Sequence, residues 1–315
     1  MVSNCIFDEM RICLSAIDIL LLQNQKEKDI FLILRFKMRG YVPQDLLPQL
    51  PFILGLMVLA IFIAYWIFIY YFQADHSDND KLIIYFAIVS VFMFFWSFRK
   101  AVCTEPGYVP KGNIEPNDEQ LAGLSDQEKR ERRYCPTCKL FKPERVHHCS
   151  QCQRCVLNMD HHCIWTANCV GLMNRKYFNL VLQWGTISLL FGAFFGARYA
   201  YRTIEDILFE TENERWVWML FHCFCLLIIV AGFSNFIGLL IFMLTHLNYI
   251  LNNVTTLDSM KGSKSSQYSF GKIENYKFYF GKNPLLWLVP VGKPLGDGYR
   301  WNKNHKQDEE EERQL

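Results

Sequence analysis

The chain has 315 residues, of which 51% are hydrophobic and 16% aromatic, and its formal net charge is only +2. This balance lacks the basic excess of a nucleic-acid-binding protein, so we expect no nucleic-acid partner. The apolar residues also collect into four uncharged runs, which argues against a soluble globular protein.

The four runs cover residues 51–72, 82–98, 177–197 and 216–244. A helix needs roughly 20 apolar residues to cross a bilayer, with about 17 as the lower limit, so each run predicts a membrane-spanning helix. The second run is the shortest, and its helix can extend past Arg99 and Lys100. The fourth is long enough to tilt or to continue as a helix outside the membrane. Buried core helices of a soluble protein are the alternative interpretation.

The distribution of Lys and Arg predicts how these helices are oriented. Residues 99–176 contain thirteen Lys and Arg, whereas the loop 198–215 has three Arg against five acidic residues. By the positive-inside rule, the segment 99–176 and both termini face the cytoplasm. We place this multi-pass protein in an endomembrane, the Golgi or the endoplasmic reticulum, with the plasma membrane as the alternative.

The chain therefore divides into six segments. They are a cytoplasmic N-terminal arm (1–49), the first two helices (50–103), a linker (104–134), a cysteine-rich domain (135–176), the last two helices (177–245) and a cytoplasmic tail (246–315). Within the linker, Ser125 and Glu128 have the spacing of a capping box, which predicts the start of a short helix.

Seven of the twelve cysteines and four of the histidines lie between Cys135 and Cys169. In a reducing cytoplasm such a cluster indicates metal binding or catalysis and not disulfide bonds. A structural zinc ion takes four Cys or His ligands, so two ions need eight of these eleven candidates. The three that remain are where we look for chemistry.

The spacing predicts two interleaved zinc sites. One C-x2-C pair is followed by a C-x2-C-x2-C triple that starts at Cys149, and the middle cysteine of the triple cannot close two pairs at once. A RING-type ubiquitin ligase also interleaves two zinc ions, but its ligand series ends in another C-x2-C pair. Here five residues separate the last two cysteines, Cys163 and Cys169, so the RING pattern does not fit.

Residues 135–178 read C-x2-C-x3-K-P-x-R-x2-H-C-x2-C-x2-C-x4-D-H-H-C-x-W-x2-N-C-x-G-x2-N-x3-F. This string resembles the cysteine-rich domain of the DHHC family of protein S-acyltransferases. Similar family landmarks occur at Glu105-Pro106-Gly107, at Thr255-Thr256-Leu257-Asp258 and around Asn275. The departures are Ile164 where the family has proline, Glu105 for aspartate and Asp258 for glutamate. The two acidic exchanges preserve charge, and Ile164 is expected to alter turnover without abolishing it.

The resemblance, with the four runs, implies an all-α integral membrane protein with four transmembrane helices. A cytoplasmic domain, mostly irregular and β-hairpin in structure, would hold two zinc ions between the second and third spans. The ligand sets that the resemblance implies are Cys135, Cys138, His148 and Cys155 for the first structural Zn²⁺, and Cys149, Cys152, His162 and Cys169 for the second. Both ions would be closed by four protein ligands and would have no open position for catalysis.

Cys163 is then free of metal and stands beside His161. A histidine that accepts the proton of a cysteine makes it a thiolate nucleophile, and Asp160 can orient that histidine. The resemblance implies transfer of a long-chain acyl group, as in palmitoyl-CoA, to Cys163 and then to cysteines of substrate proteins. Membrane-associated substrate proteins, acyl-CoA and the lipid bilayer are the expected partners.

Three further predictions concern the acyl donor and the tail. Arg133, Lys142 and Arg145 are expected to bind the CoA phosphates, with a generally basic membrane-facing surface as the alternative. From the resemblance, Ser188 would lie where the acyl chain ends, which suits chains of about sixteen to eighteen carbons. Thr256 would contact the Asp160 region, and Asn275 would hold the tail against the domain.

Two other functions remain open from the sequence. One is a catalytically silent zinc scaffold, which would not need the unliganded His161 and Cys163. The other is a membrane ubiquitin ligase, which the ligand order disfavours.

Overall fold

The computed structural model describes residues 78–110, 124–209, 215–261 and 267–301. The predicted arm (1–49) and the first apolar run (51–72) lie outside these residues. The helices are α4 (Asp78–Cys103), α6 (Asp126–Glu131), α7 (Arg175–Phe209), α8 (Arg215–Leu251), α9 (Thr256–Met260) and α10 (Lys272–Phe280), followed by the 3₁₀ helix η2 (Pro284–Leu286).

Three helices of the described chain are long and apolar enough to cross a membrane. Their apolar stretches are Lys81–Cys103 in α4, Arg175–Tyr201 in α7 and His222–Leu251 in α8, so the second, third and fourth predicted spans are helical. As predicted, α4 runs past Arg99 and Lys100, and α8 continues beyond residue 244. The chain is thus a membrane protein with three candidate spans in the described part.

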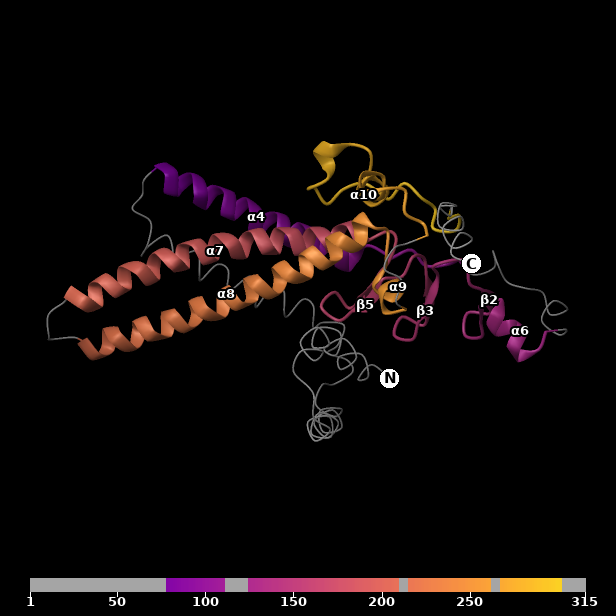
Figure 1. The fold of residues 1–315 in the computed structure, drawn as a ribbon, viewed down its shortest axis with the longest axis horizontal. Coiled ribbons are helices and arrows are strands. Elements are labelled where there is room, and N and C mark those ends of the chain that lie inside the picture. The colour runs from indigo at the N-terminus through magenta and orange to yellow at the C-terminus, as the bar shows by residue number, and fades with distance from the viewer. Residues whose placement is uncertain (1–77, 111–123, 210–214, 262–266, 302–315) are drawn as a thin grey trace, which may run out of the picture.

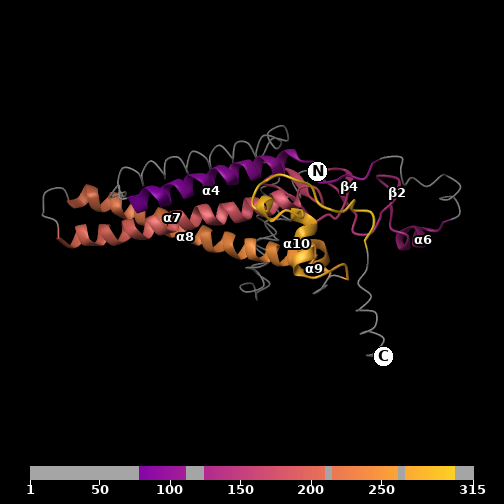
Figure 2. The same cartoon turned by 90° about the horizontal axis from the view of Figure 1, so that it is seen from above.

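The helix α7 packs against both α4 and α8 and lies between them in Figure 1, and Figure 2 shows α7 and α8 crossing when seen from above. Gly185 allows this close approach, because a Cβ atom at this position would lie 3.0 Å from Leu239 of α8 and 3.3 Å from Phe94 of α4. Small residues at such contacts are typical of helices packed in membranes, where close packing replaces the hydrophobic effect.

The cysteine-rich segment forms three antiparallel hairpins at one end of the helices (Figure 1). They pair β1 (Tyr134–Cys135) with β2 (Leu140–Phe141), β3 (His147–Cys149) with β4 (Arg154–Val156), and β5 (His161–Cys163) with β6 (Asn168–Val170). The short helix α6 precedes them and begins with the predicted capping box of Ser125 and Glu128.

Two asparagines fasten the third hairpin to the end of α4. Asn168 donates to the carbonyls of Val102 (3.1 Å) and Thr104 (3.0 Å), and Asn174 donates to the carbonyls of Ala101 in α4 (3.4 Å) and Cys169 in the hairpin (2.8 Å). Because the last carbonyls of a helix have no partner within it, these amides both satisfy α4 and fix the hairpin's position.

The tail returns to the same end of the helices. As predicted, Asn275 holds it there: its amide donates to the carbonyl of Leu251 at the end of α8 (2.8 Å), and its oxygen accepts from the backbone of Phe270 (3.0 Å). The described ends of α4 and α8, the start of α7, the hairpins and the tail therefore meet in one region.

Candidate active site

The three hairpins share one local geometry. Cys135, Cys149 and Cys163 lie 14 residues apart and occupy equivalent positions. The turn residue four positions after each cysteine is left-handed: Lys139 (φ 55°), Gln153 (φ 52°) and Ala167 (φ 46°). The hairpin that carries Cys163 therefore has the same turn as the two that carry C-x2-C pairs.

Two groups of Cys and His side chains converge between the hairpins. The first comprises Cys135, Cys138, His148 and Cys155, and the second comprises Cys149, Cys152, His162 and Cys169. Within each group, all four potential ligand atoms lie within 4.8 Å of one another. These are the two quartets that the sequence resemblance implied.

The spacing of the ligand atoms fits zinc. Tetrahedral Zn²⁺ with ordinary Zn–S and Zn–N bonds sets neighbouring ligand atoms about 3.6–3.8 Å apart. In the second group, the Nδ1 atom of His162 lies 3.6 Å from Cys149, 3.4 Å from Cys152 and 3.6 Å from Cys169, measured to Sγ. In the first, His148 Nδ1 lies 3.3–3.9 Å from its three sulfurs. Both groups can therefore hold a four-coordinate zinc ion.

The strand β5 separates the candidate metal ligand of the D-H-H-C motif from the two residues that flank it on the strand. His162 pairs with Cys169 across the hairpin, and both belong to the second quartet. Because side chains alternate along a strand, His161 and Cys163 project from the opposite face. A hydrogen bond links the side chains of His161 and Cys163.

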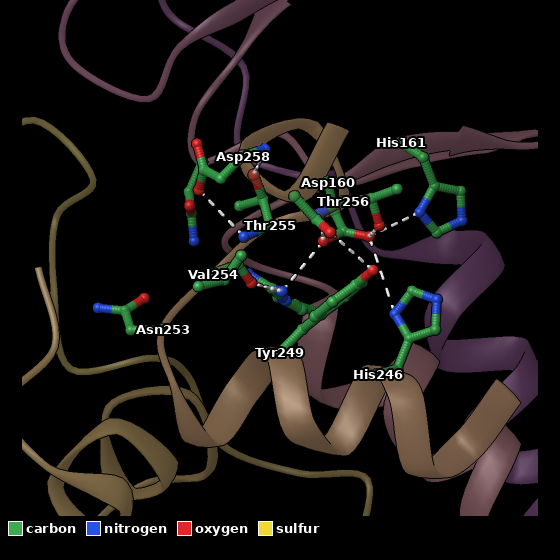
Figure 3. A network of polar contacts seen from close by, with 12 residues as sticks. Asp160, His161, His246, Tyr249, Asn253, Val254, Thr255, Thr256 and Asp258 are labelled. Carbon is green, nitrogen blue, oxygen red and sulfur yellow. Dashed lines mark hydrogen bonds and ion pairs between the residues drawn. The ribbon is translucent and has the colours of Figure 1, made fainter. Parts of the chain in front are cut away.

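Asp160 is fully buried and connects His161 to the helices (Figure 3). Its Oδ2 atom lies 2.8 Å from His161 Nδ1 and accepts a hydrogen bond from the Thr256 hydroxyl at 2.8 Å. Its Oδ1 atom accepts from the backbone N–H of Thr256 (3.0 Å) and pairs with Arg175 (3.0 Å). The predicted contact of Thr256 with the Asp160 region is confirmed.

These contacts set the charges of the pair. Burial alone would raise the pKa of Asp160, but Arg175 and the hydrogen bond from His161 hold it well below its usual value. Burial alone would lower the pKa of His161, but its hydrogen bonds with Asp160 and Cys163 raise it to about 10. Asp160 is thus an anion that orients His161 through Nδ1 and stabilises the protonated imidazole.

Cys163 is buried on the side of its hairpin that faces the membrane helices. It is 3% exposed and packs with Val170, Phe178 and Leu182, with Phe242 and Met243 of α8 next to them. The ring of His161 is in edge contact with Phe178, with ring centroids 5.1 Å apart. The thiol therefore lies between a polar network on one side and apolar side chains of α7 and α8 on the other.

The predicted phosphate-binding residues differ in their surroundings. Arg145 is buried, donates to Asn253 and Asp258, and stacks on Trp301 at 4.4 Å, so the structure favours a structural role for it. The side chains of Arg133 and Lys142 are partly exposed. A backbone hydrogen bond from the Lys142 N–H to the Arg133 carbonyl (3.1 Å) places the two residues next to each other.

A third cation, Lys261 just after α9, joins Arg133 and Lys142 around His147. Burial, Lys261 and Arg133 together lower the pKa of His147 to about 4. No sequence pattern pointed to Lys261, because only the fold brings the end of α9 to the hairpins.

Sequence reasoning also missed two residues of the Asp160 network. Arg175, at the start of α7, is fully buried, and His246 of α8 places Nδ1 3.9 Å from Asp160 Oδ2 (Figure 3). Arg175 stands next to Lys176 and could be taken for an ordinary cation flanking a span. An uncharged histidine near the end of an apolar run gives little signal of its own.

Ser188, the predicted end of the acyl cavity, lies between α7 and α4. It is 1% exposed, and its hydroxyl is 2.9 Å from that of Ser90, which is also fully buried. At the level of Ser188, the contact between α7 and α4 is therefore made by two small hydroxyl side chains.

Comparisons with known proteins identify the family to which this sequence is similar. The family model described as DHHC palmitoyltransferase matches residues 128–263. A probable protein S-acyltransferase 12 of Arabidopsis thaliana is 31% identical over 70% of this chain and 77% of its own length. The palmitoyltransferase ZDHHC15 of Rattus norvegicus is 31% identical (71% of this chain, 72% of its own), and the human ZDHHC20 is 30% identical (71% and 67%).

Proposed function

This chain belongs to the DHHC palmitoyltransferase family and is a protein-cysteine S-palmitoyltransferase, and from that premise we propose which residues perform the transfer. Cys163 is the nucleophile, His161 the general base and Asp160 the residue that orients His161. The observation that supports these roles is the alternation along β5, which places His162 among three cysteines and places His161 beside Cys163 and Asp160.

In the first step, His161 already holds the proton of the Cys163 thiol, as its raised pKa favours, and the resulting thiolate attacks the thioester carbonyl of acyl-CoA. The bond from the carbonyl carbon to the CoA sulfur breaks, and CoA leaves with the proton held by His161. The product is a thioester between the acyl group and Cys163.

In the second step, His161 takes the proton of a cysteine on the substrate protein, and that sulfur attacks the acyl thioester. Cys163 leaves as a thiol after regaining the proton, so one thioester replaces another. Because this exchange is nearly balanced in free energy, the enzyme needs mainly to activate thiols and to hold the reactants together.

The two Zn²⁺ ions, held by the two Cys/His quartets, would fix the hairpins and take no part in either step. The palmitoyl chain would lie among the apolar side chains next to Cys163, such as Phe178, Leu182 and Phe242. Arg133, Lys142 and Lys261 would meet the CoA phosphates, whereas Arg145 would support them from inside the domain.

Both termini would face the cytoplasm, in a Golgi or endoplasmic reticulum membrane, and substrate proteins would approach from that side. The excess of Lys and Arg in residues 99–176 supports this orientation. The first predicted span, residues 51–72, would complete the set of four helices.

The experiment is labelling with radioactive palmitoyl-CoA of the full chain, beside Cys163→Ser and Cys103→Ser. We expect the wild type and Cys103→Ser to take up label that hydroxylamine removes, and Cys163→Ser to take up none. Cys103 is exposed at the end of α4 and is the matched control for adventitious acylation. Label that persists in Cys163→Ser would overturn the assignment, and an unlabelled wild type would favour a silent scaffold.

A further inference from the structure

A short apolar segment, residues 284–292, follows α10 and exposes three leucine side chains, whereas Trp287 packs against the core and Pro290 is buried. Leu285 is 86% exposed, Leu286 40% and Leu288 49%. Exposed lysines bracket the segment, Lys282 before it and Lys293 after it. A loop that faces water normally exposes its polar backbone and buries its leucines. This segment instead exposes its leucines.

The backbone N–H groups of this segment are mostly paired locally. Positions 284 and 290 are prolines and have no N–H to satisfy. Within the segment, the N–H groups with a partner at 2.8–3.2 Å are those of Leu285, Leu286, Trp287, Val289 and Val291. Few donors are therefore left to need water.

Side chains of α7 pair the carbonyl groups. Lys176 donates from Nζ to the carbonyls of Leu286 (2.8 Å) and Val291 (2.7 Å). The hydroxyl of Tyr177 donates to Gly292 (2.6 Å), and the indole N–H of Trp184 donates to Leu288 (2.9 Å). Non-helical backbone is tolerated at membrane depth only where the protein satisfies its polar groups, and α7 does this here.

The position along α7 gives the depth of the segment. Lys100 of α4 lies over the Tyr177 ring at 5.3 Å, which marks the level where a lysine reaches the polar surface. Trp184 follows seven residues later, about 10 Å further along the helix axis. The bond from Trp184 to the Leu288 carbonyl therefore holds the segment beside the apolar part of α7.

We propose that residues 284–292 form a re-entrant loop that inserts into the bilayer leaflet on the hairpin side. Leu285, Leu286 and Leu288 contact lipid chains, while Lys282 and Lys293 lie at the phospholipid headgroups. The occupant of this apolar surface is the bilayer, because the surface continues directly from the membrane-spanning part of α7. The loop thereby fixes the C-terminal tail to the membrane.

The test places a photoreactive benzoylphenylalanine at position 285 of the full chain in nanodiscs of phosphatidylcholine and phosphatidylserine. Matched variants carry it at position 227, an apolar site on α8 that is 69% exposed, and at position 131, an exposed site on α6. All three are accessible, so the surrounding medium decides what each captures. A content of two zinc ions per chain in each variant shows that the hairpins are folded.

We expect lipid adducts at 285 to be as abundant as at 227 and about tenfold above those at 131, because lipid chains surround an inserted side chain and not a hydrated one. A yield at 285 equal to that at 131 would overturn the proposal. It would mean that the leucines face water or await a protein partner. Because the readout is a lipid adduct and not activity, its failure would leave the assignment of Cys163 untouched.

Discussion

At the scale of single residues, the neighbours His161 and His162 have unlike environments because strand side chains alternate. His162 lies among the sulfurs of three cysteines, and His161 bonds to Asp160 on the other side of the strand. The face of β5 from which each imidazole projects decides its chemistry, because the residue type is the same. A shift of one residue in the register would exchange the two environments.

We expect His162→Ala to release about one zinc ion per chain and to destabilise the hairpins, because structural zinc contributes directly to folding free energy. His161→Ala should keep both ions and lose acyl-enzyme formation by about 10²–10⁴-fold, the usual contribution of a positioned acid–base group. Elemental analysis and single-turnover labelling measure the two effects. Zinc loss in His161→Ala, or full activity with zinc loss in His162→Ala, would reverse the assignment.

At the scale of elements, the sequence predicts the helices and the ligand set well and the tertiary network poorly. The apolar runs, the Ser125 capping box and the cysteine spacing are local signals, and α4, α6, α7, α8 and both quartets agree with them. Arg175, His246 and Lys261 reach the site only because α7, α8 and α9 meet at the hairpins. Arg145 illustrates the reverse case, since the sequence gives no sign that partners far along the chain, here Asn253 and Asp258, bury this basic residue.

The α8–α9 junction supplies a bond that positions Asp160. Thr256→Val keeps the shape and the backbone N–H bond but removes the hydroxyl bond to Oδ2. Since hydrogen bonds to charged groups contribute about 1.5–3 kcal/mol, we expect acyl transfer to fall roughly 10- to 100-fold with both zinc ions retained. Thr245→Val, at an exposed position on α8, is the control. Equal rates for the two variants would show that Thr256 does not position Asp160.

Asp258 ties α9 to the hairpin domain through Arg145 at 3.0 Å and completes the capping box of α9. Burial alone would raise its pKa, but Arg145 and the bonds from Thr255 lower it below the usual 3.8. The ionised Asp258 carboxylate therefore contributes to the free energy of unfolding at pH values above 3.8. This contribution is lost only as the pH falls through the lower pKa of the folded state. We expect Asp258→Asn to lower the free energy of unfolding by about 2 kcal/mol, equally at every pH from about 8 to 5. Denaturant titrations at several pH values measure it, and a difference that shrinks between pH 8 and 5 would contradict the assigned ionisation.

At the scale of the whole molecule, a polar reaction centre is joined to an apolar interior. Asp160, Thr256 and Arg175 lie on the hairpin side of Cys163, and side chains of α7 and α8 lie on the other. Further along α7, Ser188 meets Ser90 of α4. An acyl chain attached to Cys163 would run along α7 towards Ser188 and Ser90. The size of these two side chains would then set the longest acyl chain that fits.

We expect Ser188→Phe to shift the preference among acyl-CoA donors towards chains shorter than sixteen carbons, because each CH₂ that cannot be buried loses about 0.8 kcal/mol. Ser234→Phe, at an exposed position on α8, places the same ring outside the helix contacts and should leave the preference unchanged. Competition between labelled donors of different length measures this. If both variants keep the wild-type preference, the end of the acyl chain lies elsewhere.

The recurrence of one hairpin every 14 residues accounts for a cysteine at position 163 that belongs to neither quartet. Each quartet joins two successive hairpins, with a C-x2-C pair from one and a facing His–Cys pair from the next, so three units make two junctions. At the first open end, the facing positions are Tyr134 and Phe141, whose rings close on each other at 5.4 Å. At the last open end the chain becomes α7, and Cys163 is a ligand position without a fourth unit to share it. Thr166 stands where the other two hairpins have the second cysteine of the C-x2-C pair, so the proposed role of Cys163 depends as much on the threonine at 166 as on the cysteine at 163.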